Sequence, residues 1–169
     1  MKGAFGVAKR YGICIIEMMK ITFRDITQDN FYECMRLSVK KDQPFVASNA
    51  FSVAESKIFP FWITKAIYAD EQMVGFLMYA NFYEVNELYL CRFMIDTRFQ
   101  GKGYGKGTLD LLKEIAMEDQ RIEKMKLSTS KDNANGIRIY EKFGFKDTNE
   151  MDDGEEVFVM DLGKGQSIR

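Results

Sequence analysis

The hydrophobic pattern at the start of the chain predicts a strand followed by a helix. Residues 20–25 alternate apolar and polar side chains, as in a half-buried β-strand. Thr27 can cap a helix over residues 28–40. The apolar stripe of this helix carries Phe31, Met35 and Val39. The domain is therefore expected to open with a β-then-α unit.

A shorter helix and a hairpin are predicted next. Ser52 and Glu55 have the spacing of a capping box, which would start a helix that Pro60 disturbs and would give Glu55 a structural role. Two apolar runs, residues 66–69 and 73–82, are joined by a short acidic turn. This pattern predicts a pair of antiparallel strands.

Residues 87–96 predict a central strand, because apolar side chains occupy both of its faces. Arg92 is the one costly exception in this run. The pattern places Tyr89, Cys91, Phe93 and Ile95 on one face and Leu88, Leu90 and Met94 on the other. We expect both faces of the sheet to be covered at this strand.

The second half of the chain continues the mixture of helices and strands. A helix over residues 103–118 has apolar positions at helical spacing and packs one face on the sheet. Those positions are Thr108, Leu111, Leu112 and Ile115. Strands are predicted over residues 124–130 and 156–162, and a short helix over residues 137–143 starts near Asp132-Asn133 and stops at Gly144. No repeat or linker divides the series, which predicts one mixed α/β domain.

Composition narrows the function classes. The 169 residues are 46% hydrophobic and 14% aromatic, enough for one compact core. With 24 Lys plus Arg against 25 Asp plus Glu, no global field indicates nucleic acid or an anionic membrane as partner. The absence of histidine removes Ser-His and Cys-His nucleophiles, so proton transfer must use Tyr, Lys, carboxylates or water. Cys14, Cys34 and Cys91 fit neither a disulfide framework nor a zinc site, so we expect no metal and a reducing cytoplasm.

The first residues are treated apart from the domain. Two basic residues precede a short apolar run, as in a signal sequence, but the run is too short and meets Glu17. No later stretch approaches the roughly 20 apolar residues that span a bilayer. We expect an extension over residues 1–18, upstream of a natural start at Met18 or Met19, a domain over residues 19–163 and a tail over residues 164–169.

A glycine-rich turn, residues 100–105, lies directly between a predicted strand and a predicted helix. Unpaired backbone N–H groups at a helix start, together with the helix dipole, favour an anion. Glycines allow close approach of the backbone, and Lys102 and Lys106 can add positive charge. The turn therefore suits a phosphate group, and a flexible connection without a ligand is the alternative.

Two known phosphate-binding motifs fail at this turn. A dinucleotide fingerprint beginning at Gly101 needs glycine where Lys106 stands, and it expects the first βα unit of the chain. A Walker A loop ending at Lys106 needs Ser or Thr where Gly107 stands and glycine where Gln100 stands. The turn matches instead the Q/R-x-x-G-x-G/A signature of the GNAT N-acetyltransferase superfamily, as Gln100, Gly103 and Gly105.

The resemblance to this superfamily covers residues 20–162. Residues 92–96 resemble the strand before the turn, and residues 133–145 resemble the family segment Asn-x-x-Ala-x-x-x-Tyr-Glu-Lys-x-Gly-Phe. The resemblance implies an acetyl-coenzyme A-dependent N-acetyltransferase. It implies the GNAT fold, a single α/β domain of the α+β type whose mixed, mostly antiparallel central sheet is flanked by helices.

The same resemblance implies how acetyl-coenzyme A would bind. Its pyrophosphate would lie on the backbone of the glycine turn, and its pantetheine arm and thioester would contact main-chain groups of the preceding, splayed strand. Asn133 would hold the amide or phosphate region of the cofactor, a role compatible with capping a helix. The expected cofactor-binding residues are Phe93, Met94, Ile95, Gln100, Gly101, Lys102, Gly103, Tyr104, Gly105, Lys106 and Asn133.

Acetylation of an amine needs a base, because a primary ammonium with a pKa near ~10 must lose a proton before its nitrogen can attack. It also needs an acid that donates a proton to the departing thiolate, whose conjugate acid has a pKa near ~8.5. Tyr140, which matches the tyrosine of the family segment, is the candidate general acid. Burial as a core aromatic beside Ile137 is its alternative role.

The candidate base is harder to assign. Similar amine acetyltransferases often carry a carboxylate where Cys91 stands, and a thiol is a poor substitute that fits better as a small buried hydrophobe. Glu87, on the same strand face, and Glu84 are candidates for a proton relay through water or for attracting a cationic substrate. Solvated charges at a strand end are the alternative.

A further resemblance concerns the amine that accepts the acetyl group. Residues 41–49, 52–55 and 74–79 resemble bacterial diamine and polyamine (spermine/spermidine) acetyltransferases. A polyamine needs spaced carboxylates, for which Glu33, Asp42 and Glu55 are candidates, although Glu33 also fits a solvated helix face. Two kinds of alternative stay open: another acceptor amine, such as an aminoglycoside, an amino acid or a protein amino terminus, and a non-catalytic acyl-coenzyme A-binding module. Exposed edge strands in a small sheet allow a homodimer.

Overall fold

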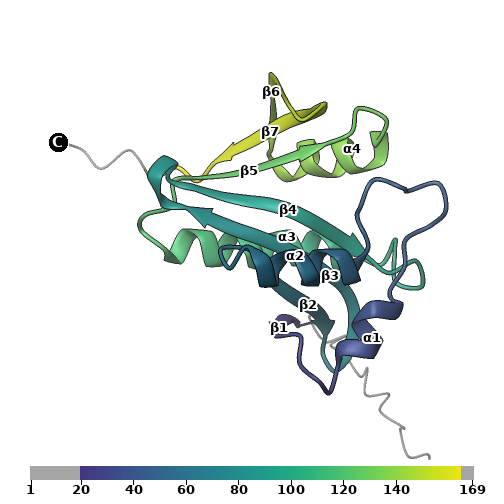
Figure 1. The fold of residues 1–169 in the computed structure, drawn as a ribbon. Helices are drawn as coiled ribbons and strands as arrows, with labels where there is room; N and C mark the ends of the chain where they lie inside the picture. Colours follow the sequence, from purple (N-terminus) through teal and green to yellow (C-terminus); the bar gives the residue numbers. More distant parts are fainter. Residues whose placement is uncertain (1–19, 165–169) are drawn as a thin grey trace, which may run out of the picture.

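The computed structural model describes residues 20–164, which form one mixed sheet with helices on both of its faces (Figure 1). The predicted extension over residues 1–18 and the predicted tail beyond residue 164 lie outside the described residues. The strands are β1 (Ile21–Arg24), β2 (Ile63–Ala69), β3 (Gln72–Phe82), β4 (Glu87–Ile95), β5 (Lys124–Thr129), β6 (Lys146–Asp152) and β7 (Glu155–Asp161). The helices are α1 (Phe31–Arg36), α2 (Asn49–Ile58), α3 (Tyr104–Glu118) and α4 (Ala134–Phe143), with a short 3₁₀ helix η1 (Tyr83–Val85).

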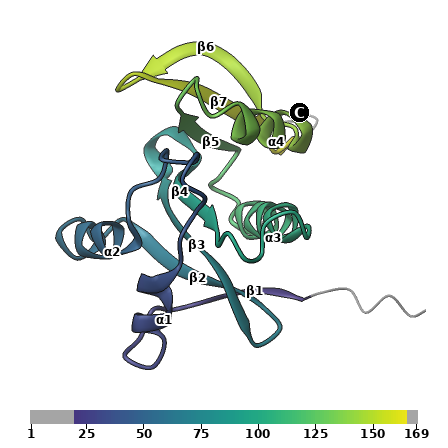
Figure 2. The same ribbon diagram turned by 90° about the vertical axis from the view of Figure 1, so that its right-hand side faces the viewer.

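The sheet has the strand order β1-β2-β3-β4-β5-β7-β6. Neighbouring strands are antiparallel except β4 and β5, which are parallel. Helices α1 and α2 lie on one face, and α3 and α4 on the other (Figure 2). The predicted mixed, mostly antiparallel sheet flanked by helices is confirmed. None of the helices within residues 20–164 is long and apolar enough to cross a membrane.

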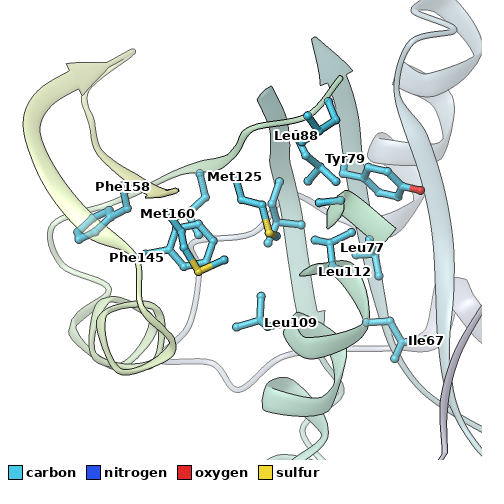
Figure 3. Close-up of a cluster of buried hydrophobic side chains, with 14 of the residues drawn as sticks. Ile67, Leu77, Tyr79, Leu88, Leu109, Leu112, Met125, Phe145, Phe158 and Met160 are labelled. Atoms are coloured by element: carbon cyan, nitrogen blue, oxygen red, sulfur yellow. The ribbon is translucent and has the colours of Figure 1, made fainter. Parts of the chain in front are cut away.

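The core is divided by the sheet into two clusters of buried side chains. The larger one lies against α3 and α4, where Leu109 and Leu112 contact side chains of the central strands (Figure 3). The smaller one lies under α1 and α2 and includes Cys34 and Phe76. The predicted helix over residues 103–118 is confirmed as α3, but its most buried positions are Thr108, Leu109, Leu112 and Ala116. Burial on both sides explains the apolar character of β3 and β4.

Helix α1 is much shorter than the helix predicted over residues 28–40. Its end is set by tertiary contacts, because the Ser38 N–H donates to the Asp96 carboxylate at 2.9 Å. The Ser38 carbonyl accepts from the Thr97 N–H at 2.8 Å. The chain is thereby held extended against the end of β4. Thr27 does not cap α1 but closes a turn, in which its N–H donates to the Asn30 side chain.

Helix α2 starts earlier than predicted, and the predicted capping box is wrong. Ser48 is the N-cap, and its hydroxyl accepts from the Phe51 N–H at 3.2 Å. Ser52 is buried inside the helix and donates to the Ser48 carbonyl. Glu55 is therefore free of a capping role, and its carboxylate lies 3.8 Å from the Arg92 guanidinium on β4.

A β-bulge in β4 changes the faces that simple alternation predicts. Met78 pairs with Arg92 and Tyr79 pairs with Leu90, so Cys91 is an extra residue in β4. After the bulge, the alternation of β4 side chains between the two faces of the sheet is shifted by one residue. Leu88, Leu90, Phe93 and Ile95 therefore share the α3 side, while Cys91 and Met94 belong to the α1–α2 side. The predicted grouping of Cys91 with Phe93 and Ile95 was wrong, because a bulge places two consecutive residues opposite one.

The pattern did not reveal β6. Every side chain of this edge strand except Thr148 is exposed, so it has no apolar face to produce an alternating signal. Its pairing with β7 is interrupted between Asp147 and Met151. The remaining elements of the second half agree with the prediction, and Gly144 ends α4 in the left-handed conformation.

Candidate active site

The parallel strands β4 and β5 separate part of the way along their length (Figure 1). Their pairing runs from Glu87 and Lys124 to Leu90 and Leu127 and then stops. β4 continues as far as Ile95. The edge of residues 91–95 that faces β5 is thus left without a strand partner on that side. Such an edge offers backbone N–H and C=O groups to an extended ligand.

A cavity of about 340 Å³ lies at this end of β4. It is in the size range of small-molecule sites. Its walls are the loop between α1 and α2 (Val39, Gln43, Phe45, Val46), the end of β4 (Phe93, Met94, Ile95), the glycine turn (Phe99, Gln100, Gly101, Gly103, Tyr104, Gly105, Lys106) and α4 with its N-cap (Asn133, Asn135, Gly136, Ile139, Tyr140). Of the eleven cofactor-binding residues expected from the sequence, Lys102 alone is absent from these walls.

The glycine turn has the geometry of an anion site. Gly101 and Gly103 have φ angles of 77° and 88°, which favour glycine because a side chain is strained there. Gly103 is the N-cap of α3 and offers no side chain to the first turn. The first helical N–H with an intrahelical partner is that of Gly107, which donates to the Gly103 carbonyl at 3.1 Å. The earlier N–H groups of the turn are therefore available to a ligand.

Side chains around the turn hold it against β4. The Gln100 amide donates to the Ile95 carbonyl at 2.9 Å and to the Gln43 side chain at 2.8 Å. The buried Asp96 carboxylate accepts from Ser38 and from Arg98. Burial alone would raise the pKa of Asp96, but the hydrogen bonds from Arg98 and Ser38 hold it below its usual value. Gln100 is thus a structural link as well as a cavity residue.

The two lysines of the turn are held differently. Lys106 lines the cavity and forms an ion pair with Asp110 one helical turn later, at 2.7 Å. Lys102 is exposed, and its ammonium lies 5.4 Å from the centre of the Phe99 ring. Both cations lie beside the turn, which raises the local positive potential.

Asn133 forms the start of α4. Its side-chain oxygen accepts from the Gly136 N–H at 3.1 Å, which confirms it as a helix cap. Its amide donates to the buried hydroxyl of Thr129 at 2.9 Å, which ties α4 to the end of β5. The cap therefore fixes the direction in which α4 presents its side chains to the cavity.

Tyr140 lies on α4, lines the cavity and packs edge-on against Phe145 at 6.0 Å between ring centres. Burial raises the pKa of Tyr140 to about 12, and the negative charge of Glu155 adds to this shift. The hydroxyl is therefore protonated at neutral pH. The tyrosine is thus both a packed aromatic and a cavity residue.

The acidic residues considered for the site do not gather at the cavity. Glu84 is exposed in η1, and Glu87 forms an ion pair with Lys124 at 2.9 Å. At ~3.3 Å per residue, Glu87 is about 20 Å along β4 from Phe93. Glu33 and Asp42 are both exposed, in α1 and in the loop that follows it. Glu55 is half-buried on α2, where it faces β4.

Cys91 stands at the bulge where β4 and β5 part. Burial raises its pKa to about 11, although the neighbouring Arg92 opposes the shift. Arg92 donates to the Cys91 sulfur at 2.8 Å. The thiol is therefore neutral at physiological pH and does not replace a carboxylate base.

Several cavity residues were not among those expected from the sequence to bind the coenzyme. Gln43, Phe45 and Val46 come from the loop between α1 and α2, which reaches the cavity through the long-range contact of Gln43 with Gln100. Asn135 and Ile139 line it from α4. Their position within the family-like segment at residues 133–145 was the available signal.

Comparisons with known proteins agree with this geometry. The model of the acetyltransferase (GNAT) family matches residues 21–145. The chain is 33% identical over 152 residues to a spermine/spermidine N(1)-acetyltransferase of Bacillus subtilis (strain 168), covering 85% of this chain and 100% of the relative. A probable spermine N(1)-acetyltransferase of Bacillus subtilis subsp. natto is 32% identical with the same coverage.

Solved structures share the fold at low identity. Spermidine N-acetyltransferase from Vibrio cholerae, in complex with CoA and spermine, has a TM-score of 0.67 at 13% identity, covering 85% of this chain and 96% of that one. PaiA N-acetyltransferase from Thermoplasma acidophilum, in complex with coenzyme A, has a TM-score of 0.61 at 21% identity, covering 85% and 99%. With this fold, the family match and the cavity at the glycine turn, the chain belongs to the GNAT family and is an acetyl-coenzyme A-dependent N-acetyltransferase.

Proposed function

We propose that the protein transfers the acetyl group of acetyl-coenzyme A to a primary amine of a polyamine such as spermine or spermidine, by direct attack on the thioester. The observation that carries the substrate class is the 33% identity to a spermine/spermidine N(1)-acetyltransferase whose whole length the chain covers. A reducing cytoplasm is the proposed setting, consistent with the free thiols of Cys34 and Cys91.

In this proposal the cavity holds the coenzyme. Backbone N–H groups of residues 101–106 bind the pyrophosphate, with Lys102 and Lys106 adding positive charge. The unpaired edge of β4, Phe93 to Ile95, binds the pantetheine arm and fixes the thioester. Asn133, besides capping α4, orients the wall against which the arm lies.

Tyr140 is the proposed general acid. Tyr140 lines the cavity, and its hydroxyl is protonated at neutral pH because burial raises its pKa to about 12. As the C–S bond breaks, the phenol can donate its proton to the developing thiolate. This keeps the leaving group from attacking the new amide.

The acceptor amine is proposed to approach from the α2 side of the sheet. Glu55 is the predicted carboxylate that lies beside the bulge, and one of its oxygens is buried without a hydrogen-bond partner. Glu33 and Asp42 are exposed along the same N-terminal region and can attract the distal charges of an elongated cation. Glu84 and Glu87 stay predictions for attraction at longer range.

A thiol-release assay with acetyl-coenzyme A and a panel of amines tests the function. We expect release with spermine, spermidine or putrescine, and much weaker release with aminoglycosides, amino acids and peptide amino termini. If an aminoglycoside, an amino acid or a peptide amino terminus is the preferred substrate, the proposed acceptor class is wrong but the proposed reaction stands. Coenzyme binding without turnover of any amine would indicate an acyl-coenzyme A-binding module instead.

A further inference from the structure

A chain of hydrogen-bonded side chains crosses the sheet where β4 and β5 separate. The Ser128 hydroxyl on β5 lies 2.9 Å from the Tyr89 hydroxyl on β4. The same hydroxyl donates to the Glu155 carboxylate at the start of β7, at 2.7 Å. Ser128 immediately follows Leu127, the last residue of β5 that pairs with β4. This row of hydrogen-bonded side chains therefore ends in the Glu155 carboxylate, beside the opening between β4 and β5.

Glu155 is held by Ser128 on one face of the sheet, next to the point where the pairing of β4 with β5 stops. Burial is the main cause of the raised pKa values of Tyr140 and Cys91, and the negative charge of Glu155 adds to each. Tyr140 approaches from the cavity side and Cys91 belongs to the α1–α2 side. Phe158 packs on the α3 side, so alternation along β7 places Glu155 on the opposite face, the side from which the amine is proposed to arrive.

The neighbouring groups leave Glu155 as the best placed proton acceptor. Cys91 is neutral and accepts a hydrogen bond from Arg92. Glu55 lies 3.8 Å from the Arg92 guanidinium, so a cation stands next to its carboxylate. The contact that Glu155 makes is with the neutral hydroxyl of Ser128, so its charge is not neutralised there by a cation. Asp152 on β6, which pairs with Glu155 across the β6–β7 hairpin, adds negative charge beside it.

We propose that Glu155, positioned by Ser128, receives the proton of the acceptor ammonium and so supplies the base that is missing at Cys91. This inference rests on the proposed function. The N–H bond of the ammonium breaks and its proton passes to the carboxylate. The freed nitrogen lone pair forms the N–C bond with the acetyl carbon, and the C–S bond breaks as Tyr140 protonates the sulfur. The nitrogen loses a second proton, which restores the Tyr140 phenol, and Glu155 releases its proton to solvent.

The test compares Glu155→Gln with Glu156→Gln, which removes the same charge one residue away on the opposite face of β7. We expect Glu155→Gln to lower turnover about 10²-fold, the usual scale for loss of an acid–base group, with an unchanged KM for acetyl-coenzyme A. Glu156→Gln should turn over like the wild type. Folding of each variant is checked by circular dichroism and by coenzyme binding.

The pH profile separates a base from a structural group. Without Glu155 the reaction must wait for amine that is already neutral in solution, so the rate of the Glu155→Gln variant should rise about tenfold per pH unit below the ammonium pKa near ~10. The wild-type profile should be flatter. Formate should partly restore Glu155→Ala by supplying a carboxylate in the vacated space, whereas chloride should not.

Each outcome decides a separate point. Wild-type turnover and pH profile in Glu155→Gln would overturn the assignment of Glu155 and leave the proposed function intact. If Glu155→Gln does not fold, Ser128→Ala replaces it, and a pH profile unchanged by that substitution would overturn the assignment. Absence of thiol release by the wild-type protein with every amine overturns the proposed function and this inference together.

Discussion

Single residues at the cavity have their chemical state set by their surroundings. Tyr140 keeps its proton at neutral pH because burial disfavours the phenolate, and Cys91 keeps its proton for the same reason. Asp96 stays charged although it is buried, since Ser38 and Arg98 donate to it. The site thus has a proton donor on α4, a neutral thiol in β4 and a structural anion just after the end of β4.

Replacing Tyr140 by Phe should lower turnover about 10²-fold, because the ring still packs while the proton donor is lost. The KM for acetyl-coenzyme A should change little. Thiol release under saturating substrate measures the effect. Replacing the nearby Phe143, which packs on the same core without lining the cavity, by Leu is the control. Equal turnover in the wild type and Tyr140→Phe would remove Tyr140 from the mechanism.

Replacing Asp96 by Asn should lower the free energy of unfolding by about 1–3 kcal/mol at pH 7, since buried donors lose their charged acceptor. The folded-state pKa of Asp96 is lowered, so its stabilisation is present above the ordinary pKa near ~3.9 and is lost as pH falls through the folded value. Urea unfolding at pH 7 and pH 3 should show the difference between wild type and variant shrinking at pH 3. A constant difference would contradict this account.

At the scale of elements, caps and bulges decide where side chains point. Asn133 caps α4 and is tied to β5 through Thr129, which aims Tyr140 at the cavity. The bulge at Cys91 reverses the phase of β4 and brings Phe93 to the α3 side. The parting of β4 and β5 after Leu90 then opens the sheet between these elements.

Replacing Ser48 by Ala should destabilise the protein by about 1 kcal/mol, because the Phe51 N–H loses its capping acceptor. Replacing Ser48 by Asp should retain the stability, since Asp is an equally good N-cap. Thermal unfolding monitored by circular dichroism distinguishes the three proteins. A loss for both variants would show that the position is sensitive for a reason other than capping.

At the scale of the whole molecule, the sheet has two edge strands, and the cavity lies where distant parts of the chain meet. The edge strands are β1 and β6, and β6 carries exposed charged side chains that disfavour edge-to-edge pairing. The homodimer expected from the sequence stays a prediction. The cavity lies where the loop between α1 and α2, the glycine turn and α4 meet, so a bound coenzyme would link distant parts of the chain.

Coenzyme A at 100 times its Kd should stabilise the folded protein by about 2.7 kcal/mol and raise Tm by roughly 5–10 °C. Gly103→Ala should lose stability and most of this coenzyme effect, because its φ of 88° is unfavourable for alanine at the anion site. Gly154→Ala, with a φ of 82° in the turn between β6 and β7, should lose similar stability but keep the full effect. If coenzyme A raises the Tm of both variants by the same amount, the pyrophosphate does not bind at the turn.

Local signals in the sequence were enough for much of the fold and for the cofactor side of the site. The turn at Gln100–Gly105 and the cap at Asn133 were predictable because their geometry depends on neighbouring residues. Glycine suits the positive φ angles of the turn, and asparagine is one of the residues that favour a helix N-cap. The strands β3 and β4 were predictable because burial on both faces demands a nearly continuous apolar run, and the helix α3 because burial of one face demands apolar residues at helical spacing.

Contacts between distant residues settled the rest. Helix α1 ends early because Ser38 bonds to Asp96, which lies 58 positions later in the chain. The bulge at Cys91 exists only in the pairing of β4 with β3. Glu155 reaches the site through Ser128, 27 positions away, and Ser128 reaches Tyr89 over 39 positions. A local sequence pattern does not predict these long-range contacts, because they depend on the order and register of the strands in the folded sheet.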